Sequence, residues 1–187
     1  MSLVQDLVSR FGSRRVHLGI PLAPYSTLKV GGPADCLVST ATSEETIDAL
    51  RIASRAGAPV TLLGGGSNVL IGDGGIRGLV IRPRQAEIRS LGEGRVRADA
   101  AVRTSRLVRW TVDRGLSGLE AWAGTPGTVG GAISGNAHFS GRALGELVQT
   151  VGLATPDGTV RASLHCYNDA EDVDRLLTTV SELAGSR

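Results

Sequence analysis

Residues 62–70, with the sequence LLGGGSNVL, decide the fold, and they follow a short apolar run that begins at Val60. Three consecutive glycines let the backbone turn sharply, so that several N–H groups can converge on one anion. Ser67 and Asn68 add polar side chains. No Lys-Ser or Lys-Thr pair follows, as a Walker loop requires, and the spacing is not that of a dinucleotide-binding Gly-x-Gly-x-x-Gly turn. Taken alone, the stretch could equally be a tight hairpin turn.

Two further glycine-rich segments accompany this one. Residues 123–137, AGTPGTVGGAISGNA, contain five glycines and few large side chains, so the backbone can lie flat against a ring or a phosphate. Here we expect Gly130 and Gly131 to leave room for a ligand. Residues 27–36, TLKVGGPADC, place Lys29 close to two more glycines. Three such segments in one small chain indicate a long, flat, anionic ligand, and a dinucleotide fits that description.

Composition restricts the class of protein. The chain has 187 residues, 41% of them hydrophobic, which is enough to bury the core of one domain or of two small lobes. A net charge of +2 and only 3% aromatic residues argue against a nucleic-acid surface. No apolar run approaches the length of a membrane span. Neither Cys36 nor Cys166 has a metal-ligand spacing, so we expect no metal and a reduced, cytoplasmic protein.

The first 82 residues are predicted to form a mixed α/β lobe. An amphipathic helix is expected over residues 3–11, and two short β-like runs over residues 27–40. Residues 42–59 should form a second helix, with Thr42 and Glu45 as a capping box and with Ile47 and Leu50 facing inward. A buried strand at 60–63 and a strand at 78–82 should follow.

Residues 83–160 are predicted to form a second α+β lobe. A hairpin is expected over residues 86–100, because apolar and polar residues alternate around two glycines. A helix should begin near Thr104, with Leu107, Val108 and Val112 inward, and end at Gly115. A second hairpin should turn at residues 156–158. The fold class is therefore α+β, with two lobes and glycine-rich loops at their junction.

Three motifs carry a specific resemblance: YSTLKVGGPAD (residues 25–35), LLGGGSNVLIGDGGIRGLVI (62–81) and GLSGLEAWAGTPGTVGGAISGNA (115–137). In this order and spacing they resemble the UDP-N-acetylenolpyruvoylglucosamine reductases, also called UDP-N-acetylmuramate dehydrogenases, over residues 20–160. That family has the FAD-binding fold of the p-cresol methylhydroxylase type. The resemblance implies FAD as cofactor, NADPH as hydride donor, a UDP-sugar substrate and a cytoplasmic role in peptidoglycan synthesis.

The resemblance also implies which residues bind FAD. The amides from Gly64 to Asn68 would hold the diphosphate, while the second loop and the first lobe would line the rest of the cofactor. The full set is Lys29, Gly31, Gly32, Leu63, Gly64, Gly65, Gly66, Ser67, Asn68, Val69, Gly124, Thr125, Pro126, Gly127, Thr128, Val129, Gly130, Gly131, Ala132 and Asn136. After this loop the family often has Gly-Ala-Tyr-Gly, whereas this chain has the four residues from His138 to Gly141. We interpret His138 as a partner for a loop carbonyl or phosphate rather than as catalytic.

The catalytic residues of that family have no match in this sequence. The family uses a serine to protonate the substrate, and an arginine and a glutamate to stabilise the enolate charge. The chain departs from the family pattern around residues 158–161, so no catalytic residue is assigned. Three functions therefore stay open: the reductase in a truncated form, a non-catalytic flavin-binding module, and a remnant that binds nothing.

Residues 161–187 are predicted to be a tail of different origin. The segment GTVRASLHCYNDAEDVDRLLTTVSELA resembles the C-terminal part of class V aminotransferases, in particular cysteine desulfurases, without the lysine motif that binds pyridoxal phosphate. We interpret it as a junction of two reading frames, natural or artefactual. The alternative is an ordinary amphipathic helix that covers an apolar face. The oligomeric state cannot be predicted from the sequence.

Overall fold

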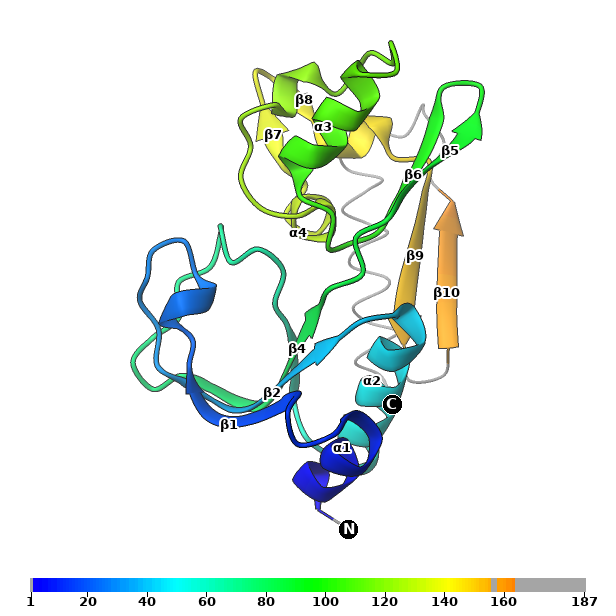
Figure 1. Cartoon of the computed structure of the whole chain (residues 1–187). Coiled ribbons are helices and arrows are strands. Elements are labelled where there is room, and N and C mark those ends of the chain that lie inside the picture. Colours follow the sequence, from blue (N-terminus) through cyan, green and yellow to red (C-terminus); the bar gives the residue numbers. More distant parts are fainter. Residues whose placement is uncertain (1, 156–157, 164–187) are drawn as a thin grey trace.

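The computed structural model describes residues 2–155 and 158–163. A mixed sheet forms one part of the molecule, with the strand order β1-β2-β4-β3 (Figure 1). Strand β1 (Val16–Pro21) runs antiparallel to β2 (Pro33–Thr40), while β2 and β3 (Val60–Leu62) both run parallel to β4 (Ile76–Pro83). The middle of β4 is buried because it is apolar on both faces, as expected for a central parallel strand.

The two faces of this sheet are covered differently. Helices α1 (Leu3–Phe11) and α2 (Ser43–Arg55) lie on one face, where their apolar stripes pack against residues such as Val38 and Ile81. In the described chain no α-helix contributes to the apolar cluster on the opposite face, although the short 3-10 helix η1 (Ala23–Tyr25) packs Tyr25 against it. Its apolar cluster joins the strands to residues of loops: Leu22, Ala34, Leu37, Leu63, Ile71 and Val80.

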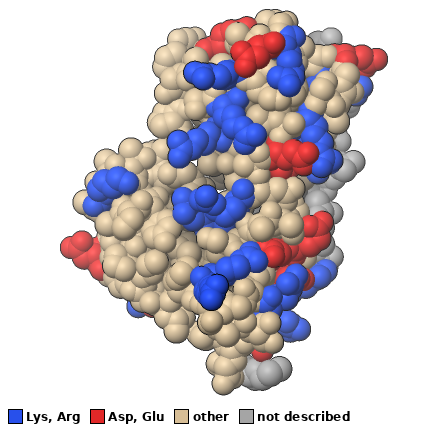
Figure 2. Space-filling view, in the orientation of Figure 1, with Lys and Arg blue, Asp and Glu red and all other residues tan. Residues whose placement is uncertain are grey.

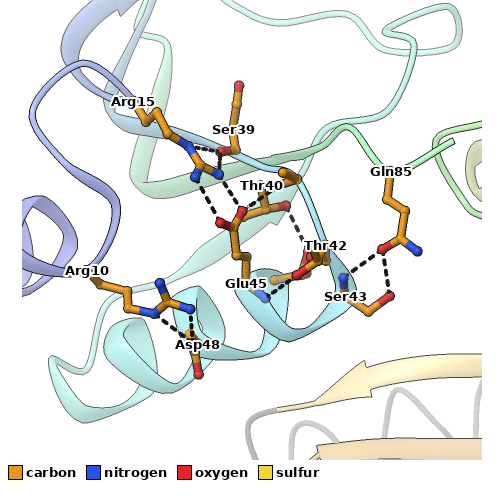
Figure 3. Close-up of polar contacts among 11 residues, drawn as sticks. Arg10, Arg15, Ser39, Thr40, Thr42, Ser43, Glu45, Asp48 and Gln85 are labelled. Atoms are coloured by element: carbon orange, nitrogen blue, oxygen red, sulfur yellow. Dashed lines mark hydrogen bonds and ion pairs between the residues drawn. The ribbon is translucent and has the colours of Figure 1, made fainter.

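An ion pair and a helix cap fix the start of α2 (Figure 3). Thr42 Oγ1 accepts a hydrogen bond from Glu45 N at 3.1 Å, as predicted. The predicted capping box is only half formed, because the Glu45 carboxylate turns instead to Ala41 N, at 2.6 Å, and to the Arg15 guanidinium. Arg15 also donates to Ser39 O at 2.7 Å, so one side chain joins the loop before β1 to the end of β2 and to α2.

The second part of the molecule holds a helical cluster and hairpins. Helix α3 packs beside the short helix α4 around the buried Trp122. The elements are β5 (Ile88–Gly92), β6 (Arg95–Ala98), α3 (Thr104–Val112), η2 (Glu120–Trp122), α4 (Val129–Ser134), β7 (His138–Phe139), β8 (Arg142–Ala143), η3 (Leu144–Leu147), β9 (Thr150–Thr155) and β10 (Gly158–Ser163). Both predicted hairpins are confirmed, as the antiparallel pairs β5–β6 and β9–β10.

Two of the contacts between these parts involve α2. Strand β9 contacts α2, so the second hairpin runs alongside the helical layer of the first part (Figure 1). Gln85, in the segment that leaves β4, accepts a hydrogen bond from Ser43 N at 2.8 Å (Figure 3). The division of the chain at residue 82 stays a prediction, and it falls one residue before β4 ends.

Several predicted details of the first part were wrong. Strand β3 is not buried, because it lies at the edge of the sheet, and its Leu62 side chain is 58% exposed. Residues 27–30 form no strand, since this segment crosses to the glycine loop instead of pairing with a neighbour. Ile47 is only partly buried, because α2 turns Thr46, Ala49, Ile52 and Ala53 to the core. Leu50 does face inward, where it packs against the edge of that core.

Helix α3 also departs from its prediction. Its N-cap is Arg103, without a side-chain cap, so Thr104 is the first helical residue rather than the cap. Val112 is 54% exposed, and Thr111 takes the inward position instead. Leu107 and Val108 are buried as predicted, so only the last position of the predicted inward face was wrong.

The predicted C-terminal helix, with Cys166, lies outside the described residues. Cys36 lies buried in β2, and burial raises the pKa of its thiol above the usual range, so it is a protonated core side chain. Within the described ranges, no helix combines the length and the apolar character needed to cross a bilayer. Those residues also contain no group of three or more His, Cys, Asp and Glu that could hold a metal ion.

Candidate functional site

The two larger glycine loops touch each other through glycine positions. A Cβ built on Gly65 would lie 3.0 Å from Gly127 Cα, and one built on Gly64 would lie 2.6 Å from Thr128 Oγ1. A Cβ on Gly127 would lie 2.5 Å from Ser67 Oγ. Glycine is therefore required on both sides of this contact, because any larger residue would push the two loops apart.

The third glycine-rich segment, residues 27–36, is hydrogen-bonded to the first loop. Thr27 N donates to Gly66 O at 2.8 Å. Gly66 has φ +66°, and a Cβ there would lie 2.0 Å from Tyr25 O, so no other residue fits this position without a shift of the backbone. The three glycine-rich segments, distant in the sequence, are therefore joined through the first loop.

Gly31 and Gly32 pack against the far end of the first loop. Gly32 N donates to Gly72 O at 3.0 Å, and a Cβ on Gly32 would lie 1.9 Å from Asp73 O. Their small size therefore closes the loop between β3 and β4. Lys29 is exposed, and its Nζ is 3.5 Å from Pro24 O.

Free amide groups concentrate where the loops meet. In the described part of the chain, no N–H group from residues 64–68 donates to a protein acceptor, and the same holds for Gly127 and Thr128. Consecutive amides left free in this way can serve as an anion-binding nest. The free amides end at Thr128, because Val129 N donates to Val102 O at 2.8 Å and Gly130 N donates to Ala100 O at 2.9 Å.

The second loop is therefore only partly a ligand surface. The expectation that Gly130 leaves room was wrong, since a Cβ there would lie 2.7 Å from Ala100 Cβ, so Ala100 occupies that space. Thr128 Oγ1 caps α4 by accepting from Gly131 N at 3.4 Å. Asn136 is buried, and its Oδ1 accepts from Gly145 N at 3.2 Å, so this oxygen orders the loop. His138 lies exposed on β7.

Two polar side chains near the loops were missed by sequence reasoning. Thr104 Oγ1 is buried with no hydrogen-bond partner among the described residues, and Thr104 N donates to Gly127 O at 3.2 Å. The guanidinium carbon of Arg82 lies 4.9 Å from the centroid of the Tyr25 ring. Burial, together with the nearby charge of Arg84, lowers the pKa of Arg82. Neither position shows a periodic signal in the sequence.

Positive charge accumulates on this side of the molecule. Figure 2 shows Lys and Arg side chains gathered down the middle of the face, between the sheet and the helical cluster, while Asp and Glu lie mainly toward its edges. Together with the free amides, this distribution makes the junction favourable for a multiply charged anion. A cofactor with a diphosphate bridge is the class of ligand that the site fits.

Residues 34–163 match the family model of the FAD binding domain, and the chain belongs to that family. Within it, the chain is similar to UDP-N-acetylenolpyruvoylglucosamine reductases, as the three motifs predict. It is 47% identical to the one from Rubrobacter xylanophilus over 123 residues, which is 65% of this chain and 41% of the relative. It is 37% identical to the one from Myxococcus xanthus over 157 residues, 81% of this chain and 50% of that protein.

Solved structures agree with this assignment. A UDP-N-acetylenolpyruvylglucosamine reductase from Thermus caldophilus superposes with a TM-score of 0.64 at 26% identity, over 92% of this chain and 70% of that chain. p-Cresol methylhydroxylase, at 18% identity, has a TM-score of 0.63 over 85% of this chain and 34% of that one, and so shares the fold. The predictions of the fold and of FAD are confirmed. The chain spans about half the length of the curated relatives it matches.

Proposed function

We propose that this chain holds FAD at the contact between its glycine loops, with the diphosphate on the free amides of residues 64–68 and of Gly127 and Thr128. The observation behind this proposal is that these N–H groups, which have no acceptor among the described residues, lie where two loops meet at glycine positions. The other residues expected from the resemblance, from Lys29 to Asn136, are proposed to surround the cofactor. Val129 and Gly130 would do so without their amides, which are already bonded within the protein.

For the whole protein we propose the activity named in its relatives, reduction of UDP-N-acetylenolpyruvoylglucosamine with NADPH, in the cytoplasm. Bound FAD would supply hydride transfer. The residues of this chain would bind and orient that cofactor, and the loops pressed against each other would exclude water from one side of it. The groups that protonate the substrate and stabilise the enolate have no match in the sequence, so we expect little or no turnover from this chain by itself.

Flavin retention tests the binding site. The purified protein is expected to bind added FAD, measured by the flavin absorption spectrum and by quenching of flavin fluorescence. Gly65→Val should reduce the affinity on the order of tenfold or more, because the new side chain meets the Gly127 backbone. Gly74→Ala is the matched control, since a Cβ there meets nothing within 4 Å. Unchanged FAD affinity in Gly65→Val would place the diphosphate elsewhere.

Turnover separates an enzyme from a binding module. NADPH oxidation that depends on the sugar nucleotide would be measured for this chain and for an intact relative under the same conditions. A rate equal to that of the relative would contradict our expectation and would mean that residues outside the family pattern supply the catalytic groups. A protein that binds FAD without this activity would be the non-catalytic flavin-binding module.

A further inference from the structure

Arg82 occupies the face of the sheet on which the glycine loops lie. Side chains alternate along a strand, so Arg82 lies on the same face of β4 as Val80, two residues earlier. Val80 packs in the cluster that contains Leu63 and Ile71, both from the loop side, whereas Ile81 packs against the helices. The alternation therefore directs Arg82 toward the loops and away from α1 and α2.

The surroundings of Arg82 leave its charge uncompensated. Its guanidinium lies over the ring of Tyr25 and is half-buried, and in the described part of the chain it has no carboxylate partner and no hydrogen-bond acceptor. By contrast, Arg77, near the start of β4, pairs with Asp35 at 2.7 Å. Removing an unpaired cation from water is costly, so an arginine in this environment indicates an anion that the protein itself does not supply.

The free amides begin next to the point where the first loop leaves the strand that carries Arg82. Leu63 N donates to Ile81 O at 2.9 Å, and the next residue along the chain is Gly64, where the free amides begin. Tyr25 joins the two features, because its ring lies over Arg82 while its backbone oxygen contacts Gly66. Two independent anion-binding features, a row of amides and an unpaired guanidinium, therefore share one face and one neighbour.

We propose that Arg82 is the counter-charge of the FAD diphosphate, donating from its guanidinium to phosphate oxygens that the amides of residues 64–68 also contact. This inference rests on the proposed function. Backbone amides orient an anion but carry no net charge, whereas a diphosphate bridge has two negative charges. A guanidinium supplies one positive charge and a planar fork of donors that matches phosphate. Tyr25 keeps the fork in place by stacking against it.

The test compares FAD with riboflavin, which has the same ring system but no phosphate. The variants are Arg82→Gln, Arg82→Lys and, as the matched control, Arg84→Gln, which removes an exposed arginine two residues away. Each cofactor-free protein is titrated with both flavins at two ionic strengths. We expect Arg82→Gln to weaken FAD binding about 10- to 100-fold, with riboflavin binding unchanged and a smaller effect of salt. Arg82→Lys should be intermediate, and Arg84→Gln should stay within about threefold of the original protein.

The outcomes separate this inference from the proposed function. Failure of the original protein to bind FAD would overturn the proposed function. Normal FAD binding by both the original protein and Arg82→Gln would overturn only the role of Arg82. An equal loss of FAD and riboflavin affinity would also overturn that role, because it would mean a structural defect. The thermal midpoint of Arg82→Gln shows whether this variant folds, and if it does not, Arg82→Lys is used instead. If Arg82→Lys binds FAD as tightly as the original protein, the planar guanidinium is not needed and the proposed donation is contradicted.

Discussion

Thr104 has a buried hydroxyl that lacks a partner among the described residues, in direct contact with the second glycine loop through its backbone. A buried polar group without a hydrogen bond lowers stability by about 1–3 kcal/mol. Thr104→Val keeps the shape of the side chain and removes the polar atom. We therefore expect this variant to raise the free energy of unfolding by about 1 kcal/mol, measured by urea denaturation without FAD.

Thr111 supplies the control for this prediction. Its hydroxyl is also buried, but it donates to Val108 O at 2.8 Å, so Thr111→Val should give no stabilisation. Greater destabilisation by Thr104→Val than by Thr111→Val would mean that the Thr104 hydroxyl has a partner in solution. If that partner were the cofactor, the same variant would weaken FAD binding.

At this scale the sequence predicts glycines better than charged or hydroxyl groups. Gly64, Gly65 and Gly127 could be identified because a run of glycines is informative in itself. Arg82 and Thr104 could not, since their importance lies in having no partner, which depends on every element packed around them. Gly130 was misread for the same reason: a glycine can leave space for a ligand or for another segment of the protein, and only the contact with Ala100 distinguishes the two.

Among the elements, the junction of β1, β2 and α2 depends on the protonation state of Glu45. The hydrogen bond from Arg15 is the main reason that the pKa of the Glu45 carboxyl falls from 4.5 to about 2. Because this pKa is lower in the folded state, the stabilisation is present above pH 4.5 and is lost as the pH falls toward about 2. The loss should be on the order of 1–2 kcal/mol, less than full linkage gives, because the ion pair is partly exposed.

The measurement is the free energy of unfolding between pH 5 and pH 2. In Glu45→Gln it should fall less steeply with decreasing pH than in the original protein. Glu93→Gln is the control, because that side chain is 85% exposed, and it should keep the original slope. Parallel curves for Glu45→Gln and the original protein would show that the Arg15–Glu45 pair contributes no pH-dependent stability.

The helices and hairpins could be predicted from the sequence where only one face of the element is apolar. The period of residues 3–11 and the alternation around residues 92–94 match α1 and the β5–β6 hairpin. Strand β1 was missed, and β3 was taken for a buried strand. Both strands lie at edges of the sheet. Which side chains are buried there depends on the neighbouring segments, so the sequence of an edge strand need not show a two-residue period.

For the whole molecule, FAD is expected to couple the two parts, because the proposed amides come from loops of both. Binding to the folded state alone should raise the thermal midpoint as the FAD concentration increases. Amide hydrogen exchange should slow in residues 64–68 and in residues 127–128 together. Protection of only one loop would contradict a site shared between them. Residues of the exposed β5–β6 turn serve as the internal reference and should exchange equally with and without FAD.

The overall assignment came from the order of three motifs rather than from any single element. Order and spacing are what distinguish one FAD-binding family from a chain with unrelated glycine turns. The contact between the loops could not be predicted in detail, because it depends on how two parts of the chain pack. The origin of residues 161–187 remains a proposal, and most of those residues lie beyond the described ranges.

Neighbouring parallel strands are usually connected by a helix that packs on the sheet, but the connection from β3 to β4 is the glycine loop. A flat, rigid heterocycle with an anionic linker would supply the surface that such a helix normally provides. The cofactor would then pack against the sheet as a helix does in other folds, in addition to its chemical role. Cells short of riboflavin should accordingly accumulate this polypeptide in a form that proteases degrade more readily.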